Sequence, residues 1–185
     1  MIFAPDTEVA LSYAASLINS KPTPQSPETL NTVEDLLAHM AAFRWTGVMP
    51  TGEADLAQVR RTRDRLRELW NSAQQGDLES LVSAVNALLR SGRALPQLVI
   101  HEPYGWHIHA TEPDAPVAVR MSVEAAMAMV DVIRTDSLDR LLVCAGEDCD
   151  NVLIDLSRNR SRKFCDPLCA GRTHSAAYRA RKADG

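Results

Sequence analysis

Long apolar stretches and a targeting segment are absent from the sequence. No uncharged apolar run approaches the roughly 18 residues that a membrane span requires. The first 20 residues carry no basic region, and Asp6 and Glu8 interrupt their apolar stretch, which is unlike a secretory signal. We therefore expect a soluble cytoplasmic protein with no membrane partner.

Cysteine is absent from the first 143 residues, and all four cysteines lie between positions 144 and 169. A disulfide scaffold usually accompanies a secreted chain, and this chain shows no secretion signal. Clustered thiols in a reducing compartment favour a metal site instead. A nucleophile motif, a P-loop and a dinucleotide fingerprint are also missing. We therefore expect the protein not to be an enzyme.

Basic residues are scarce in most of the chain and concentrated at its end. Residues 151–185 hold eight Lys and Arg against three Asp and Glu, a net charge of +5, while residues 1–150 carry −9, so that the whole chain carries −4. An acidic body with a basic end indicates that only the C-terminal part meets a polyanion.

The composition is otherwise that of a globular protein, with 45% hydrophobic residues in a chain of 185. Apolar spacing predicts helices over about 6–19, 32–43, 52–75, 78–91 and 122–134. Two short strands are expected at 98–101 and 106–109, and a third at 117–119. We place Ser122 as the cap of the last of these helices, with Glu124 in its first turn.

The cysteines follow the pattern Cys144-x4-Cys149, then fifteen residues, then Cys165-x3-Cys169. Two short-spaced pairs of thiolates suit the four tetrahedral positions of a zinc ion. Four cysteines leave no position for a catalytic water, so we predict one structural zinc ion.

The segments around the cysteines fit this interpretation. Gly146 lets the first loop turn tightly. Residues 153–156 between the pairs read as a strand, and Asp166-Pro167 as the start of a helix that carries Cys169. Two disulfides, four unrelated thiols or an iron–sulfur cluster are the alternatives, and spacing alone does not exclude the cluster.

The same residues carry a family resemblance. Cys149–Cys165, Cys169-Ala-Gly-Arg172 and Ala177-Tyr-Arg-Ala-Arg181 closely resemble the CGNR zinc-finger family. Upstream segments are similar to the ABATE domain that precedes this finger in the family: Leu30–Leu36, Asp55-Leu56, Leu66–Leu69, Asn86–Leu89 and Trp106–His109.

The resemblance implies a mainly helical stress-response domain followed by a zinc finger, in a transcription regulator whose finger binds DNA. The chain departs from the name-giving Cys-Gly-Asn-Arg motif, because Gly171 stands where the family has asparagine. Cys169 and Arg172 remain, so we expect the metal site to be retained. The effect of the missing asparagine does not follow from the sequence.

We thus predict a mainly α (α+β) chain in two parts. Residues 1–140 form an ABATE-like helical domain with a small β-hairpin or sheet. Residues 141–185 form a small, treble-clef-like zinc module that has four cysteine ligands and ends in a helix.

Basic side chains surround the predicted zinc site, in the loop between the cysteine pairs and on the final helix. The candidate nucleic-acid contacts are Arg158, Arg160, Arg162, Lys163, Arg172, Arg179, Arg181 and Lys182. Such a basic stripe can follow phosphates, and few aromatic residues are nearby for stacking on single strands, which favours double-stranded DNA. Alternatively, these charges solvate a small domain or pair with the acidic body, or Arg158 and Arg172 bond Asp155 inside the finger.

A second basic group lies in the predicted 52–75 helix, at positions 60, 61, 63, 65 and 67. The simpler interpretation is a solvated helix face paired with Asp55, Asp64 and Glu68.

Three histidines, His101, His107 and His109, fall on the predicted hairpin. His107 and His109 share one side of a strand and could ligate a second metal or act as an acid–base pair, although partly exposed strand residues are commoner. A cleft between helices and hairpin could hold a small-molecule effector against Trp45, Trp70 or Trp106. Core or boundary positions are the commoner role of tryptophan.

We therefore expect a one-component DNA-binding regulator with an N-terminal sensing or dimerisation domain. One finger gives a small footprint, so specificity would require a homodimer. A zinc-containing adaptor that docks a protein is the second hypothesis. A metalloenzyme that uses the three histidines is the third.

Overall fold

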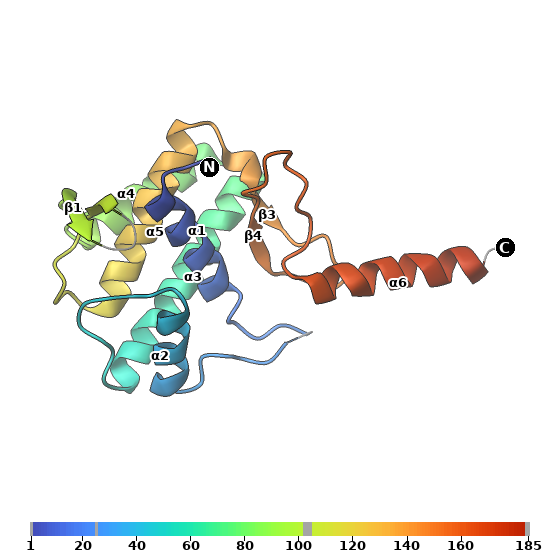
Figure 1. Ribbon diagram of the computed structural model, residues 1–185, viewed down its shortest axis with the longest axis horizontal. Helices are drawn as coiled ribbons and strands as arrows, with labels where there is room; N and C mark the ends of the chain where they lie inside the picture. The colour runs from blue at the N-terminus through green and yellow to red at the C-terminus, as the bar shows by residue number, and fades with distance from the viewer. Residues whose placement is uncertain (1, 25, 102–104, 184–185) are drawn as a thin grey trace.

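The computed structural model describes residues 2–24, 26–101 and 105–183 and is mainly helical (Figure 1). The helical elements are α1 (Pro5–Ile18), α2 (Val33–Ala42), α3 (Glu53–Gln75), α4 (Leu78–Ser91), α5 (Val117–Arg134), a short 3-10 turn (Leu138–Arg140) and α6 (Pro167–Ala183). The strands are β1 (Gln97–His101), β2 (Gly105–His109), β3 (Leu141–Val143) and β4 (Val152–Ile154). This arrangement confirms the predicted mainly α, α+β class.

Helix boundaries follow local sequence signals at several points. Thr32 caps α2 and forms a capping box with Asp35, which satisfies backbone N–H groups that the first turn leaves free. Gly76 ends α3 in a left-handed conformation (φ 69°), which glycine adopts without the steric cost that a Cβ brings. Asp77 then caps α4 through the N–H of Ser80.

The core lies where α1, α3 and α4 surround α5. Trp70 on α3 is fully buried there, so this tryptophan is a core residue. Because α5 meets three helices, side chains on most of its circumference are buried. A helix that is buried on most sides has no continuous polar face, so its sequence lacks the amphipathic pattern of an ordinary surface helix.

The predicted strand at 117–119 and the Ser122 cap are both wrong. Residues 117–122 already belong to α5, which starts after Pro116, and Glu124 lies in the interior of that helix. The alternation around Val117 and Val119 looked like a strand because this first turn is buried on several sides. The Ser122 hydroxyl donates to the carbonyl of Ala118 within the helix, at 2.7 Å.

The arginines of α3 mostly anchor neighbouring segments rather than pair along their own helix. Arg63 is buried and forms a two-bond ion pair with Glu28, at 2.8 and 3.0 Å. The guanidinium of Arg60 donates to the carbonyl of Leu30. These contacts hold the proline-rich 20–30 loop against the helix. Only Arg61 and Arg65 stay exposed as the solvated face that we expected.

Strands β1 and β2 form an antiparallel hairpin, which confirms the two strands predicted there. Leu98 pairs with Ile108 and Ile100 with Trp106, and all four side chains are exposed on the outer face. His107 lies in the alternate set and is buried.

Strands β3 and β4 form a second antiparallel pair that packs on α1 and α3. Leu141, Val152 and Ile154 belong to the same buried cluster as the helices. Helix α6 follows and projects away from the helical body (Figure 1). Among the described residues, no helix combines the length and the apolar character that crossing a membrane requires.

Candidate metal centre

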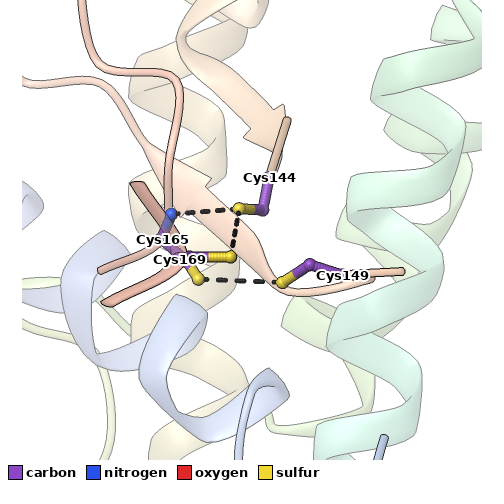
Figure 2. Close-up of side chains that lie close together, drawn as sticks. All are labelled: Cys144, Cys149, Cys165 and Cys169. Carbon is purple, nitrogen blue, oxygen red and sulfur yellow. Dashed lines mark hydrogen bonds between the residues drawn. The ribbon is translucent and has the colours of Figure 1, made fainter. Parts of the chain in front are cut away.

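The four cysteines come from two segments of the C-terminal fold, the β3–β4 connection and the start of α6, and meet at one point (Figure 2). Cys144 directly follows β3, and Cys149 lies in the loop before β4. Cys165 precedes α6, and Cys169 lies in its first turn. Cys144 and Cys169 are buried, while Cys149 and Cys165 are partly exposed.

The spacing of the sulfurs fits a single tetrahedral ion. All four lie within 4.8 Å of one another, with Cys144 Sγ 3.5 Å from Cys169 Sγ and Cys149 Sγ 3.8 Å from Cys165 Sγ. Four thiolates about 2.3 Å from a central zinc stand about 3.8 Å apart. A disulfide would bring two sulfurs to about 2.05 Å, and all four cysteines are free.

Backbone N–H groups point at the buried thiol. Those of Cys165 and Gly146 lie 3.3 and 3.4 Å from Cys144 Sγ. Burial by itself would raise the pKa of Cys144, but these donors outweigh it and hold that pKa below its usual value. The pKa values of Cys149 and Cys165 are raised, chiefly by burial. A dication is the group that would allow all four thiols to ionise together.

The loop turns tightly at Gly146, as the sequence suggested, since the Cys149 N–H donates to the Gly146 carbonyl at 3.2 Å, and close approach to the thiols is what requires glycine there. A Cβ at this position would lie 2.5 Å from Cys169 Sγ and 3.5 Å from Cys144 Sγ. The loop therefore passes directly over two of the four thiols, and any larger residue would displace them.

Asp166 starts the helix that carries Cys169, as predicted. Its carboxylate accepts a hydrogen bond from the Cys169 backbone N–H at 2.6 Å, and this bond holds the pKa of Asp166 below its usual range. The cap fixes the first turn of α6. Leu153 packs beside Cys144 and Cys169 and shields one side of the cluster from water.

The basic residues of the 158–163 loop divide into two kinds. Arg158 and Lys163 are exposed side chains near the cluster. Arg160 forms an ion pair with Asp139. The Arg162 guanidinium donates to the backbone carbonyls of Phe164 and Cys165, so it braces the approach to the third cysteine. Two of these four predicted nucleic-acid contacts thus have structural partners.

Asp155 forms bonds other than those that the sequence suggested. It is buried and accepts from the backbone N–H groups of Ser157 and Arg162, at 2.8 and 2.9 Å. Burial opposes its charge, but these bonds keep its pKa below the usual value. The guanidinium of Arg140 donates to the Asp155 carbonyl at 2.8 Å. The expected bonds to Arg158 and Arg172 are not among those of the described residues.

Helix α6 exposes Arg172, Arg179 and Lys182 to solvent. The side chain of Arg181, also predicted as a contact, lies outside the described residues. The neighbouring Cys169 thiol raises the pKa of the Arg172 guanidinium. The basic stripe therefore begins beside the metal cluster and continues along the projecting helix. Gly171 has open space around its Cα, so the family asparagine would not clash there.

The histidines do not form a second metal site among the described residues. His107 Nε2 and His109 Nε2 lie 3.0 Å apart, so they bond to each other. His107 Nδ1 lies 2.8 Å from the carbonyl of Gly105. The side chain of His101 lies outside the described residues. Across the described chain, the four cysteines are the one group of three or more candidate ligands close enough to share an ion.

Comparison with known families matches both parts of the chain. The ABATE model, described as "Putative stress-induced transcription regulator", matches residues 9–136. The CGNR zinc-finger model matches residues 140–182. None of the curated proteins compared with the chain matches it. The clustered thiols together with the finger match identify a site for one structural zinc ion, as predicted.

Proposed function

Because the chain belongs to the ABATE family and ends in a CGNR zinc finger, we propose that it is a DNA-binding transcriptional regulator that acts by binding rather than by catalysis. The zinc module would contact double-stranded DNA, and the helical domain would sense a signal or mediate homodimerisation. The observation that carries this proposal is the placement of α6, which leaves the body with its basic residues exposed (Figure 1).

The charges on this helix suit a phosphate backbone. Arg172 and Arg179 are seven residues apart, which places them on the same side of a helix two turns apart. Lys182 continues that side, and Arg158 and Lys163 add exposed charge in the adjacent loop. Arginines and lysines that neutralise phosphates release counterions, which supplies most of the affinity of non-specific DNA binding.

Charge reversal on α6 tests the proposal. We expect the double variant Arg172→Glu, Arg179→Glu to bind duplex DNA at least about tenfold more weakly, because two phosphate contacts become repulsive. The slope of log affinity against log salt should also fall by about 2. Fluorescence anisotropy with labelled duplex DNA over a range of salt concentrations measures both quantities.

A matched control makes the same charge change on the helical body. Arg61 and Arg65 on α3 are exposed and four residues apart, so Arg61→Glu, Arg65→Glu alters the net charge equally without touching α6. This control should retain DNA binding, and zinc content should be equal in all three proteins. Equal loss of binding in both double variants, or no binding by the wild type at low salt, would contradict the proposal.

Two exposed apolar side chains on α6 favour a second candidate function. Leu168 and Tyr178 are 75% and 62% exposed on this helix. A protein-docking adaptor would use them. In that case Leu168→Ser, Tyr178→Ser would abolish capture of a defined protein in the absence of nucleic acid, and the charge reversals would not.

A further inference from the structure

The helical body contains a cavity of about 470 Å³, and all of its lining residues precede the zinc module in the sequence. It lies between α1, α5, the 43–47 segment and the β1–β2 hairpin. Cavities that hold small molecules are typically of this size, with apolar walls and a few polar groups that fix the ligand.

One wall of the cavity is aromatic. The ring of Tyr13 packs edge-on against Phe43 and tilted against Trp45, with ring centroids 5.0 and 4.9 Å apart. All three side chains line the cavity. Trp45 is thus the one tryptophan that forms a cavity wall, since Trp70 is in the core and Trp106 is exposed on the outer face of the hairpin.

The arginines of the cavity are already engaged or lie outside. Arg120 is buried, and its guanidinium donates to the backbone carbonyls of Ala115, Thr46 and Val48. It therefore holds the two loops that close one end of the cavity. Arg44 and Arg134 also line the cavity, but they are exposed and solvated. Among the described residues, an anionic ligand would find no uncommitted arginine in the interior.

The carboxylates that line the cavity, unlike Arg120, accept few hydrogen bonds from the protein. Glu124 projects from α5 into the cavity, and its carboxylate accepts no hydrogen bond from any described residue. The pKa of Glu124 is raised to about 7, chiefly by burial; the charge of Arg120 opposes this rise and that of Asp6 adds to it. Asp6 and Asp131 line the same cavity. Each accepts one bond through one oxygen, from the Ile108 N–H and the Thr7 hydroxyl.

We propose that this cavity binds a small organic cation, in which a positively charged nitrogen pairs with Glu124 and an apolar or aromatic body lies against Tyr13, Phe43 and Trp45. The charges of Glu124 and Asp6 repel each other across this cavity, and a bound cation relieves that repulsion. Aromatic faces also attract positive charge. The Arg120 guanidinium already lies over the Trp45 ring, 5.8 Å from its centroid, so Trp45 supplies an apolar wall and the carboxylates supply the main attraction for the ligand's charge.

Helix α1 joins this cavity to the zinc module. It contributes Asp6 and Tyr13 to the cavity, and Asn19 at its C-terminal end bonds to Val152 of β4. A ligand that shifts α1 would therefore act on the strand pair that carries the finger. The inference deepens the sensing role proposed above and rests on it.

Binding is tested on the full-length, zinc-loaded protein with three probes of similar size: benzamidine, benzyl alcohol and benzoate. We expect calorimetry to show binding of benzamidine, and thermal melting to show a raised Tm, with weak or no response to the neutral and anionic probes. Glu124→Gln should weaken benzamidine binding by at least about tenfold, because a charge-assisted bond is replaced by a neutral one.

Glu79→Gln on the exposed surface of α4 is the matched control and should bind benzamidine as the wild type does. Benzoate or benzyl alcohol binding as tightly as benzamidine would overturn the proposal, as would an unchanged affinity in Glu124→Gln. No binding of any probe at millimolar concentration would also overturn it. If Glu124→Gln fails to fold, the comparison of the three probes on the wild type decides. These measurements contain no DNA, so a failure of DNA binding and a failure of cation binding are separate results.

Discussion

Single residues around the zinc site differ greatly in how much change they tolerate. Gly146 and Gly171 both lie within the finger, but a Cβ at Gly146 would meet the Cys169 sulfur, whereas one at Gly171 would meet nothing within 4 Å. The first glycine is fixed by the metal site. The second replaces the family asparagine in an exposed position of α6, where glycine weakens a helix relative to other residues.

We expect Gly146→Ala to weaken zinc binding by about tenfold to a hundredfold, the range found when groups that orient metal ligands are altered. The added methyl group must displace the Cys169 thiolate, which cannot move without distorting the tetrahedron. Competition with a chromophoric chelator measures the affinity. Gly171→Ala is the control, and it should retain zinc and stabilise α6 by up to about 1 kcal/mol. Equal zinc affinities in the two variants would show that the backbone of residues 145–148 shifts to accommodate the added methyl group without displacing the thiolates.

The metal ligands could be predicted from the sequence because their chemistry depends on residue type and short spacing. The partners of charged residues could not. Arg63 and Glu28 are 35 positions apart, and Arg160 and Asp139 are 21 positions apart. Only the fold brings such pairs together. The sequence places Arg162 in a basic loop, but it does not reveal that the guanidinium donates hydrogen bonds to the backbone carbonyls of Phe164 and Cys165.

Among the elements, α6 depends most on the metal. Two of the four thiols flank or lie in its first turn, and α6 projects from the body (Figure 1). Phe164 and His174 make an edge-on ring contact at 5.7 Å that adds to its attachment. The strands β3 and β4 are held differently, because their buried residues belong to the core of the helical body.

Zinc removal should therefore act unequally along the C-terminal segment. We expect chelation to increase hydrogen exchange strongly in residues 157–183, since the ion organises that region and structural zinc supplies on the order of 10 kcal/mol in small fingers. Residues of β3 and of helices α3 and α5 should remain protected by the core. Hydrogen–deuterium exchange with mass spectrometry, with and without chelator, resolves the segments. Uniform exposure of the whole chain would contradict this separation, and full protection of α6 would contradict its dependence on the ion.

The boundaries of helices with a regular amphipathic pattern were predicted closely, whereas the start of α5, which is buried on most sides, was not. Helices α3 and α4 alternate polar and apolar faces, and their glycine and aspartate boundaries fall where the sequence places them. Helix α5 was shortened by about one and a half turns in the prediction. Its first turn contacts neighbours on several sides, so the apolar residues there lost the helical period on which the prediction depended.

At the scale of the whole molecule, the zinc module and the helical body share a core. The family models divide the chain near residue 138, but Leu141, Val152 and Ile154 are buried among the helices. The division of the chain into two domains at residue 140 stays a prediction. Because the two parts share a core, we expect each to depend on the other for its stability. The family boundary marks a position in the sequence, whereas the packing of the two parts against each other is a property of the folded chain.

Asn19 is one of the polar connections between the helical body and the zinc module, beside the bonds from Arg67 to the Asp150 carbonyl and from Gln74 to the Leu141 carbonyl. Its side-chain amide donates to the Val152 carbonyl at 2.8 Å and accepts from the Val152 N–H at 2.7 Å. The amide thus pairs with both backbone groups of Val152, as a residue of a neighbouring strand would. Both bonds cross 133 positions of sequence. Loss of this amide would leave the two backbone groups of Val152 without partners in a largely buried position.

We expect Asn19→Ala to lower the free energy of unfolding by about 1–3 kcal/mol, the usual cost of leaving buried backbone groups unpaired. The wild type should melt in one cooperative step because its two parts share a core, and the variant should separate an early transition of the C-terminal segment from that of the helical body. Calorimetry of the zinc-loaded protein resolves the two steps. Asn86→Ala, at an exposed position of α4, makes the same substitution away from the zinc module and should melt as the wild type does. Identical melting curves for both variants would mean that the two Asn19 bonds do not help to join the finger to the body.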